Sequence, residues 1–261
     1  MLRQLYRRSV AIAATGAGVA FHASSIATCD ASQSFSAELS RLRAMEKDMT
    51  ERWIKDEEGW RKLPSRVWPV HQPNLDQLAV LQAKIQEECK TSGASCNALR
   101  FDLATLNVFN NLDAERGFQM YLALAREGDV NGLVAVGMCL VEGYGVEQDY
   151  AAGIHFLRQA SAAGHAQADY ELGVLYYTGA AGEDLPEDES KALEYFERAM
   201  ARGKFSYAAY MVADLLFQNG SKDDYTRALQ LMYTAAEAGH RYARQEIQTL
   251  LSGKHRILKQ L

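Results

Sequence analysis

Proline is scarce in this sequence. There are four prolines in 261 residues, and three of them lie close together, at Pro64, Pro69 and Pro73. Proline removes a backbone donor and clashes with the preceding turn of a helix, so its scarcity elsewhere leaves most of the chain free to be helical. Apolar residues make up 48% of the chain, which is enough for a packed core.

Long runs of one charge are also missing. The chain has a net charge of −5, and residues 1–29 contain Arg3, Arg7 and Arg8 but no acidic residue. The rest of the chain is therefore more acidic than the whole. An acidic surface repels phosphate backbones, so we expect no nucleic-acid partner.

Motifs of catalysis are absent from the sequence. It has no Gly-rich phosphate loop ending in Gly-Lys, no His-Glu-x-x-His helix, no Gly-x-Ser-x-Gly elbow and no Cys-x-x-Cys pair. His165 and His240 occupy the same repeat position, but they are two units apart. Because units stack about 10 Å apart, these histidines cannot share an ion, and we expect turn residues near helix C-termini, where a cation is favoured. The sequence predicts a protein that is not an enzyme, with no metal, no cofactor and no small-molecule substrate.

Cysteine is too rare for a disulfide scaffold. Of the four cysteines, Cys29 lies near the N-terminus, and Cys139 lies in an apolar segment and is expected to be a buried thiol. Cys89 and Cys96 flank six residues between two helical patterns. They form either a disulfide across a helical hairpin, in an oxidising compartment, or two reduced thiols at a turn.

The first 29 residues have the composition of a targeting segment or a weak membrane anchor. A basic, acid-free start is followed by an apolar stretch that consists mostly of Ala, Gly and Thr. This pattern is typical of a mitochondrial presequence, and a secretory signal is the alternative. The uncharged residues 9–29 are long enough to cross a bilayer, so they are the segment through which we expect any membrane association. We expect a location at the mitochondrial inner membrane or in the intermembrane space, with the secretory pathway as the alternative.

Residues 34–97 are predicted to form a helical extension: a long helix over 34–62, a proline-rich connector and a further helix. Apolar residues recur at helical spacing along the long helix, at Phe35, Leu39, Leu42, Met45, Met49, Trp53 and Trp60. The helix either packs on the end of the following domain or stays exposed to recruit a partner. Asn97 is then expected to cap the first helix of that domain.

An internal repeat organises residues 98–250, and residues 251–261 form a tail. Four positions recur with spacings of 36, 39 and 36 residues. They are an Asp at the start of the second helix of each unit, a tiny residue four positions later, an alanine seven further on, and a glycine four after that. The residues are Asp113, Asp149, Asp188 and Asp224; Gly117, Gly153, Ala192 and Ala228; Ala160, Ala199 and Ala235, with Leu124 in the first unit; and Gly128, Gly164, Gly203 and Gly239.

Each repeat position has a physical explanation. An Asp at a helix start accepts hydrogen bonds from free backbone amides. Small residues on one face allow close helix–helix approach, and Leu124 predicts looser packing, or a different neighbour, in the first unit. The glycine ends the helix because it takes a positive φ without strain. The fold class is therefore predicted to be all-α, with stacked helix pairs and a last helix over about 242–250 as a cap.

The pattern resembles the Sel-one-like repeat family, which is related to tetratricopeptide repeats. The resemblance rests on LGVLYYTG at 172–179, VEGYGVEQDYAAGIHFLRQASAAGH at 141–165 and DYTRALQLMYTAAEAGH at 224–240. It is weaker for 98–128, and it does not cover residues 1–97. The resemblance implies a right-handed α-solenoid of helix-turn-helix repeats that serves as a scaffold or adaptor.

A solenoid presents a continuous concave face, lined mainly by the first helix of each unit. Protein partners are expected there, on residues that point away from the buried stripe. The candidates are Met138, Glu142, Glu171, Val174, Thr178, Met211, Asp214 and Gln218. Ordinary exposed or half-buried positions are the alternative for each of them.

The predicted function is a non-catalytic protein–protein interaction scaffold or adaptor, such as a mitochondrial assembly factor. Two alternatives remain at this point. One is an adaptor in endoplasmic reticulum protein quality control, and the other is a structural subunit of a large membrane complex. The sequence does not distinguish among them.

Overall fold

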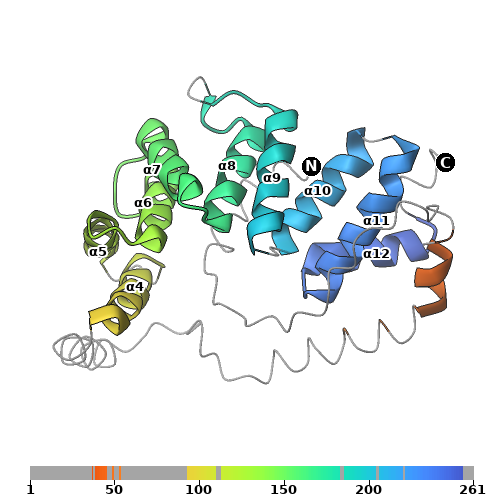
Figure 1. Cartoon of the computed structure of the whole chain (residues 1–261), viewed down its shortest axis with the longest axis horizontal. Coiled ribbons are helices and arrows are strands. Elements are labelled where there is room, and N and C mark those ends of the chain that lie inside the picture. Colours follow the sequence, from red (N-terminus) through yellow and green to blue (C-terminus); the bar gives the residue numbers. More distant parts are fainter. Residues whose placement is uncertain are drawn as a thin grey trace. The chain divides into compact units, whose positions relative to one another are not determined.

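Every secondary-structure element in the described part of the chain is a helix. The computed structural model describes residues 37, 39–45, 49, 53, 93–109, 113–182, 185–203, 206–219 and 221–254. The helices in Figure 1 are α4 (Gly93–Phe109), α5 (Ala114–Arg126), α6 (Val130–Glu142), α7 (Tyr150–Ala162), α8 (Ala166–Thr178), α9 (Glu189–Gly203), α10 (Ser206–Asn219), α11 (Lys222–Glu237) and α12 (Arg241–Leu251). The predicted all-α class is confirmed.

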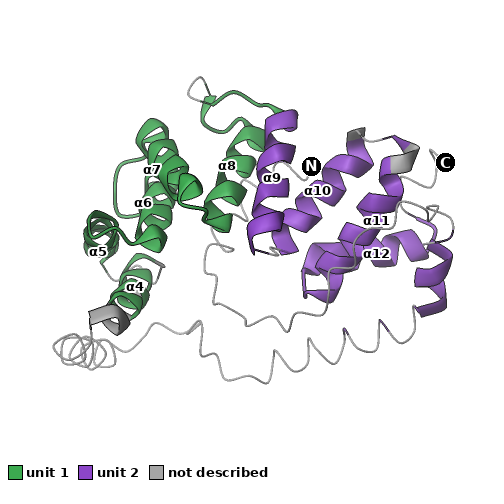
Figure 2. Cartoon of the chain, viewed as in Figure 1, with its two compact units in different colours: residues 1–19, 65–188 green, residues 20–64, 189–261 purple. Residues whose placement is uncertain are grey.

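The chain divides into two compact units (Figure 2). One consists of residues 1–19 and 65–188, and the other of residues 20–64 and 189–261. Within each unit, helices that follow one another in the chain pack together: α4 to α8 in the first, and α9 to α12 in the second. Helix α6 also contacts α8. Nearest-neighbour packing of this kind is what a helical solenoid requires.

The predicted aspartate caps are present at two of the second helices. Asp113 and Asp149 are the N-caps of α5 and α7, and each carboxylate accepts a hydrogen bond from the backbone amide three residues later. The prediction for Asp224 is wrong. Helix α11 begins three residues earlier than expected, with Ser221 as its N-cap, and Asp224 instead accepts from the backbone amide of Ser221. The two residues form a reciprocal capping box, which satisfies free amides at both positions.

The repeated glycines end their helices as predicted. Gly128, Gly164 and Gly239 have φ of 88°, 88° and 89°. After Gly164, the amide of His165 donates to the carbonyl oxygen of Ala160 at 3.0 Å, which closes the last turn. Gly203 is the last residue of α9, and the residue that follows it lies outside the described part.

His165 and His240 are turn residues directly after the C-termini of α7 and α11, as predicted, since the amide of each closes the last turn of the preceding helix. Each is also the N-cap of the next helix, α8 or α12, so the expected preference for a cation does not hold. The Nδ1 atom of His240 accepts from the amide of Ala243 at 3.2 Å, so this ring nitrogen is unprotonated. Burial lowers the pKa of His165 and lowers that of His240 to about 4. A helix N-terminus favours a neutral or negative group, which agrees with this assignment.

The small residues lie at tightly packed helix surfaces. Ala160, Ala199 and Ala235 are fully buried. Leu124 in the first unit is fully buried as well, so the larger side chain at this repeat position is also part of the core. Gly132 on α6 lies close to the same part of α5. An added Cβ atom there would lie 2.7 Å from the backbone nitrogen of Ala125 and 3.0 Å from the Leu124 Cβ, so the two helices approach closely at this glycine.

We expect Ala160→Leu to destabilise the protein by about 1–3 kcal/mol, because a fully buried alanine at a helix contact leaves no space for three more carbon atoms. Gln159→Leu is the matched control, since Gln159 is exposed on the same helix. Its effect should stay under about 0.5 kcal/mol. Urea melts of the two variants measure the difference. Equal effects would mean that the repeat register is misplaced.

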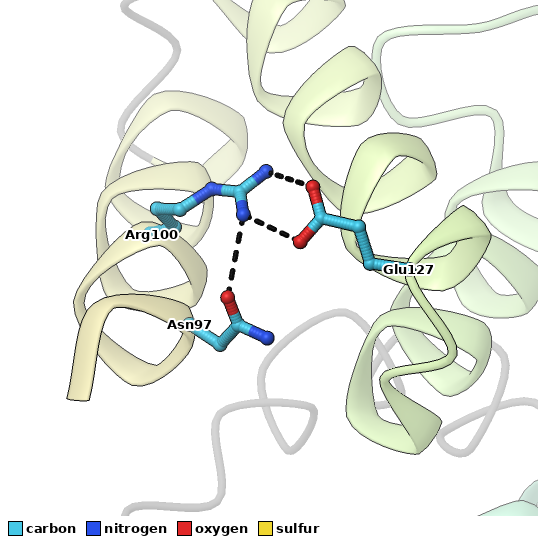
Figure 3. Close-up of polar contacts among 3 residues, drawn as sticks. All are labelled: Asn97, Arg100 and Glu127. Atoms are coloured by element: carbon cyan, nitrogen blue, oxygen red, sulfur yellow. Dashed lines mark hydrogen bonds and ion pairs between the residues drawn. The ribbon is translucent and has the colours of Figure 1, made fainter. Parts of the chain in front are cut away.

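Helix α4 begins at Gly93, earlier than predicted, so Asn97 lies inside the helix instead of capping it. The Asn97 side chain accepts a hydrogen bond from Arg100 at 3.3 Å. Arg100 also forms a bidentate ion pair with Glu127, the residue after α5 (Figure 3). Its two terminal guanidinium nitrogens lie 2.6 and 2.8 Å from the two carboxylate oxygens of Glu127. This pair links the two helices at the protein surface, where solvent weakens its contribution.

Residues of the N-terminal extension pack on the last helices of the second unit. Leu42 and Met49 are fully buried, and Trp53 is 3% exposed. The Trp53 indole donates to Glu237 at 2.8 Å, and Arg244 lies over the indole ring, 5.3 Å from its centre. The described residues of the predicted helix at 34–62 are helical, and its remaining residues lie outside the described part.

Candidate partner-binding pocket

A pocket of about 330 Å³ lies in the first unit, between α6, α7 and α8. Its volume is at the lower end of the range for ligand sites, about 300–1,000 Å³. Its lining residues are Met138, Val141, Glu142, Tyr150, Leu157, Glu171, Val174, Leu175, Thr178 and Ala180. Most are apolar, and the two carboxylates are the charged groups among them.

Five of the eight predicted binding residues line this one pocket. They are Met138, Glu142, Glu171, Val174 and Thr178. Their positions follow from helical spacing, because residues three or four apart lie on the same face. Their burial differs from what the sequence suggested. Met138, Glu171 and Val174 are 9%, 8% and 5% exposed, so they form the floor of the pocket instead of an open surface.

The other three predicted residues lie on α10, in the second unit, and they do not line the pocket. Met211 is 2% exposed and is a core residue. Asp214 is also buried, and it accepts a hydrogen bond from Gln218 at 2.5 Å. Met211 and Asp214 are buried, as Glu171 and Val174 are, but neither lines the pocket, so their part in partner binding stays a prediction. Apolar residues surround both positions in the chain, so helix α10 is buried on a wide face.

Several pocket residues were missed by sequence reasoning. Val141, Leu157 and Leu175 have the spacing of ordinary core residues, and nothing in the sequence separates a core wall from a pocket wall. Tyr150 is the first residue of α7, directly after the Asp149 cap. The signal that could have found it is this position, because a helix start next to the α6–α7 loop faces the end of α6.

Burial controls the electrostatics of the pocket. It raises the pKa of the Glu171 carboxyl to about 7, and repulsion from Glu142 adds to this effect, while a hydrogen bond with Gln167 opposes it. Burial also raises the pKa of Glu142. Neither carboxylate forms an ion pair with a basic side chain in the part of the chain that the structure describes.

Two helix ends add to the negative character of the pocket. Glu142 is the last residue of α6 and Thr178 is the last residue of α8. The carbonyl end of a helix carries a partial negative charge, so both ends favour a cation nearby. The pocket therefore combines apolar walls with two acidic side chains, one of them at the end of a helix.

No cluster of histidine, cysteine, aspartate and glutamate among the described residues could hold a metal ion. Burial raises the pKa of the Cys139 thiol to about 12, so this group is a protonated, unreactive part of the core. The predicted Cys89–Cys96 pair lies outside the described residues, apart from the backbone of Cys96 in α4. Residues 9–29 are outside them too, and no described helix is long and apolar enough to span a membrane.

The repeat period and the capping pattern have a counterpart in a known family. The model of the Sel1 repeat matches residues 131–165, 166–204 and 206–240. These residues are three Sel1 repeats. In the structure they correspond to α6–α7, α8–α9 and α10–α11. The third repeat is matched although it departs from the pattern at Ala213 and lacks the Gly-Val loop.

Solved structures support the same fold. The Sel1 repeat protein from Oxalobacter formigenes has a TM-score of 0.52 and 23% identity, over 66% of this chain and 72% of that one. A protective antigen of uropathogenic Escherichia coli strains, which displays an SLR fold, has a TM-score of 0.51 and 24% identity, over 65% of this chain and 34% of that one. The helical Sel1 solenoid predicted from the sequence is confirmed.

One curated relative is the chitin synthase regulator SKT5 of Saccharomyces cerevisiae. It is 30% identical over 141 residues, which cover 51% of this chain and 20% of the yeast protein. The chain thus spans a small part of that relative.

Proposed function

We propose that this chain is a non-catalytic adaptor that binds a segment of another protein in the pocket formed by α6, α7 and α8. The observation that carries the proposal is the pocket itself, because five predicted binding residues from two helices converge on it. Sel1 repeats build the scaffold, and a pocket with apolar walls and a few polar groups is the usual form of a binding site. The description of the yeast relative as a regulator agrees with an adaptor role.

Site-specific photo-crosslinking tests this proposal in cells that produce the full chain. A photo-reactive phenylalanine derivative in place of Tyr150, a half-buried aromatic residue that lines the pocket, should capture the partner protein, because this exchange adds little volume to the pocket. The same group at Gln159, which is exposed on α7 and outside the pocket, should not capture it. Identical adducts from both positions, or none from the pocket position, would argue against the pocket as the binding site.

We also propose a location at the mitochondrial inner membrane or in the intermembrane space, where an adaptor could act as an assembly factor. The support is the basic, acid-free composition of residues 1–29. A reporter fused to residues 1–40 should enter mitochondria, and the change of Arg3, Arg7 and Arg8 to Glu should leave it in the cytosol. Glycosylation of the reporter would instead place the protein in the secretory pathway.

A further inference from the structure

The charges of the pocket are not balanced within the chain. Glu142 and Glu171 line it from two different helices, and no lysine, arginine or histidine is among the lining residues. A buried carboxylate without a cation is costly, since burial removes its hydration. A protein core has no need of two such groups on one apolar cavity, whereas a binding site for a cation does.

The surroundings of the two carboxylates favour a cation of a particular shape. The last residues of α6 and α8, Glu142 and Thr178, both line the pocket, and the C-terminal end of a helix favours a cation nearby. The walls are apolar, with Met138, Val174 and Leu175 next to the acids. Lysine and arginine combine a charged end with an apolar stem, so they suit both features of the pocket.

We propose that the pocket receives a lysine or arginine side chain of the partner protein, with its charged end at Glu142 and Glu171 and its stem against the apolar walls. This inference rests on the proposed function and specifies its chemistry. The partner segment carries one basic residue with apolar neighbours, because the charged residues of the pocket are confined to these two carboxylates.

Selection from a random peptide library displayed on phage tests the inference with the full chain as bait. Phage that also bind the variant Thr178→Trp are discarded, because this substitution fills the pocket. A second filling variant, Ala180→Trp, repeats the step in case the first one misfolds. Both positions are half-buried and line the pocket. The peptides that remain should share a lysine or arginine beside apolar residues.

The enriched peptides are then synthesised with norleucine in place of lysine, or citrulline in place of arginine. Loss of the charge should weaken binding to the wild-type chain about tenfold or more. The double variant Glu142→Gln, Glu171→Gln keeps the shape of the pocket but not its charge. It should bind the charged and neutral peptides equally well.

The pH dependence of peptide binding is an independent test of the inference. The titratable groups that face Glu171 in the pocket are Glu142 on α6 and the phenol of Tyr150 on α7, and Gln167 contacts Glu171 from its own helix. Because burial raises the pKa of Glu171 to about 7, its charge forms between pH 6 and pH 8. Binding of the basic peptide should therefore tighten severalfold over this range, and the single variant Glu171→Gln should not show this change.

The outcomes separate this inference from the proposed function. Peptides that depend on an open pocket but contain no basic residue would overturn the inference and leave the adaptor role standing. The same holds if the neutral analogues bind as tightly as the charged peptides. If no selected peptide depends on an open pocket, both the inference and the proposed binding site are contradicted.

Discussion

Replacing Gly145 by alanine should lower the free energy of unfolding by about 3 kcal/mol or more, which makes it the most damaging small substitution that we expect in the first unit. Gly145 lies in the loop between α6 and α7 and has φ of 69°. A left-handed conformation costs a residue with a side chain about 1–2 kcal/mol. A Cβ atom here would also overlap the carbonyl group of Ala114 and lie 2.9 Å from the backbone nitrogen of Glu115.

The clash at Gly145 is with the backbone, so it cannot be relieved by a change of rotamer. Gly164→Ala is the matched control, because Gly164 has φ of 88° but nothing within 4 Å of the added atom. It should cost only the conformational strain, about 1–2 kcal/mol. Urea melts of both variants measure the cost of the conformational strain alone, at Gly164, and of the strain together with the clash, at Gly145. If the two losses are equal, the loop does not lie against the start of α5 as described.

The second large effect that we expect is a gain in folding stability. Glu171→Gln should stabilise the free protein by about 2–3 kcal/mol at pH 8, and by little at pH 5. Burial raises the pKa of Glu171 from 4.5 to about 7 in the folded state. Between these two values the folded protein keeps a proton that the unfolded chain has lost. The stability linked to this proton is fully present below pH 4.5 and is lost as the pH rises through 7.

Urea melts of wild type and variant at several pH values between 4.5 and 8 measure this linkage. The difference in unfolding free energy between the two proteins should grow with pH and level off above 7. Glu142→Gln is the control. Glu142 is half-buried, and its pKa is raised by burial alone, so its effect should be smaller. A difference that does not change with pH would mean that Glu171 is hydrated in the folded protein.

A stabilising substitution at Glu171 would also bear on function. A core selected for stability alone would place an uncharged side chain at this position, since an unpaired buried carboxylate is costly. The cost is understandable if a partner supplies the missing cation. Binding and stability measurements on Glu171→Gln therefore both test whether this carboxylate is kept for a cation of the partner.

Much of the fold could be predicted because its signals are local. An aspartate at a helix start bonds to amides three residues away, as Asp113 and Asp149 do. A glycine such as Gly164 or Gly239 ends a helix through its own backbone conformation. The failures at Asp224 and Asn97 are local too, because a serine and a glycine further upstream begin those helices instead. Where several residues that can cap a helix lie close together, the predicted start of the helix can differ from the observed one by a few residues.

The sequence by itself determined the helical class, the repeat period and the family, since these depend on residue spacing along one chain. The tertiary structure alone decided which residues are buried and which come together. Glu142 and Glu171 are 29 residues apart and meet at one pocket only because α6 packs on α8. Trp53 bonds to Glu237 across 184 residues in the same way. Burial and the pKa of a carboxyl depend on neighbours from other helices, and a pattern read along one helix does not contain them.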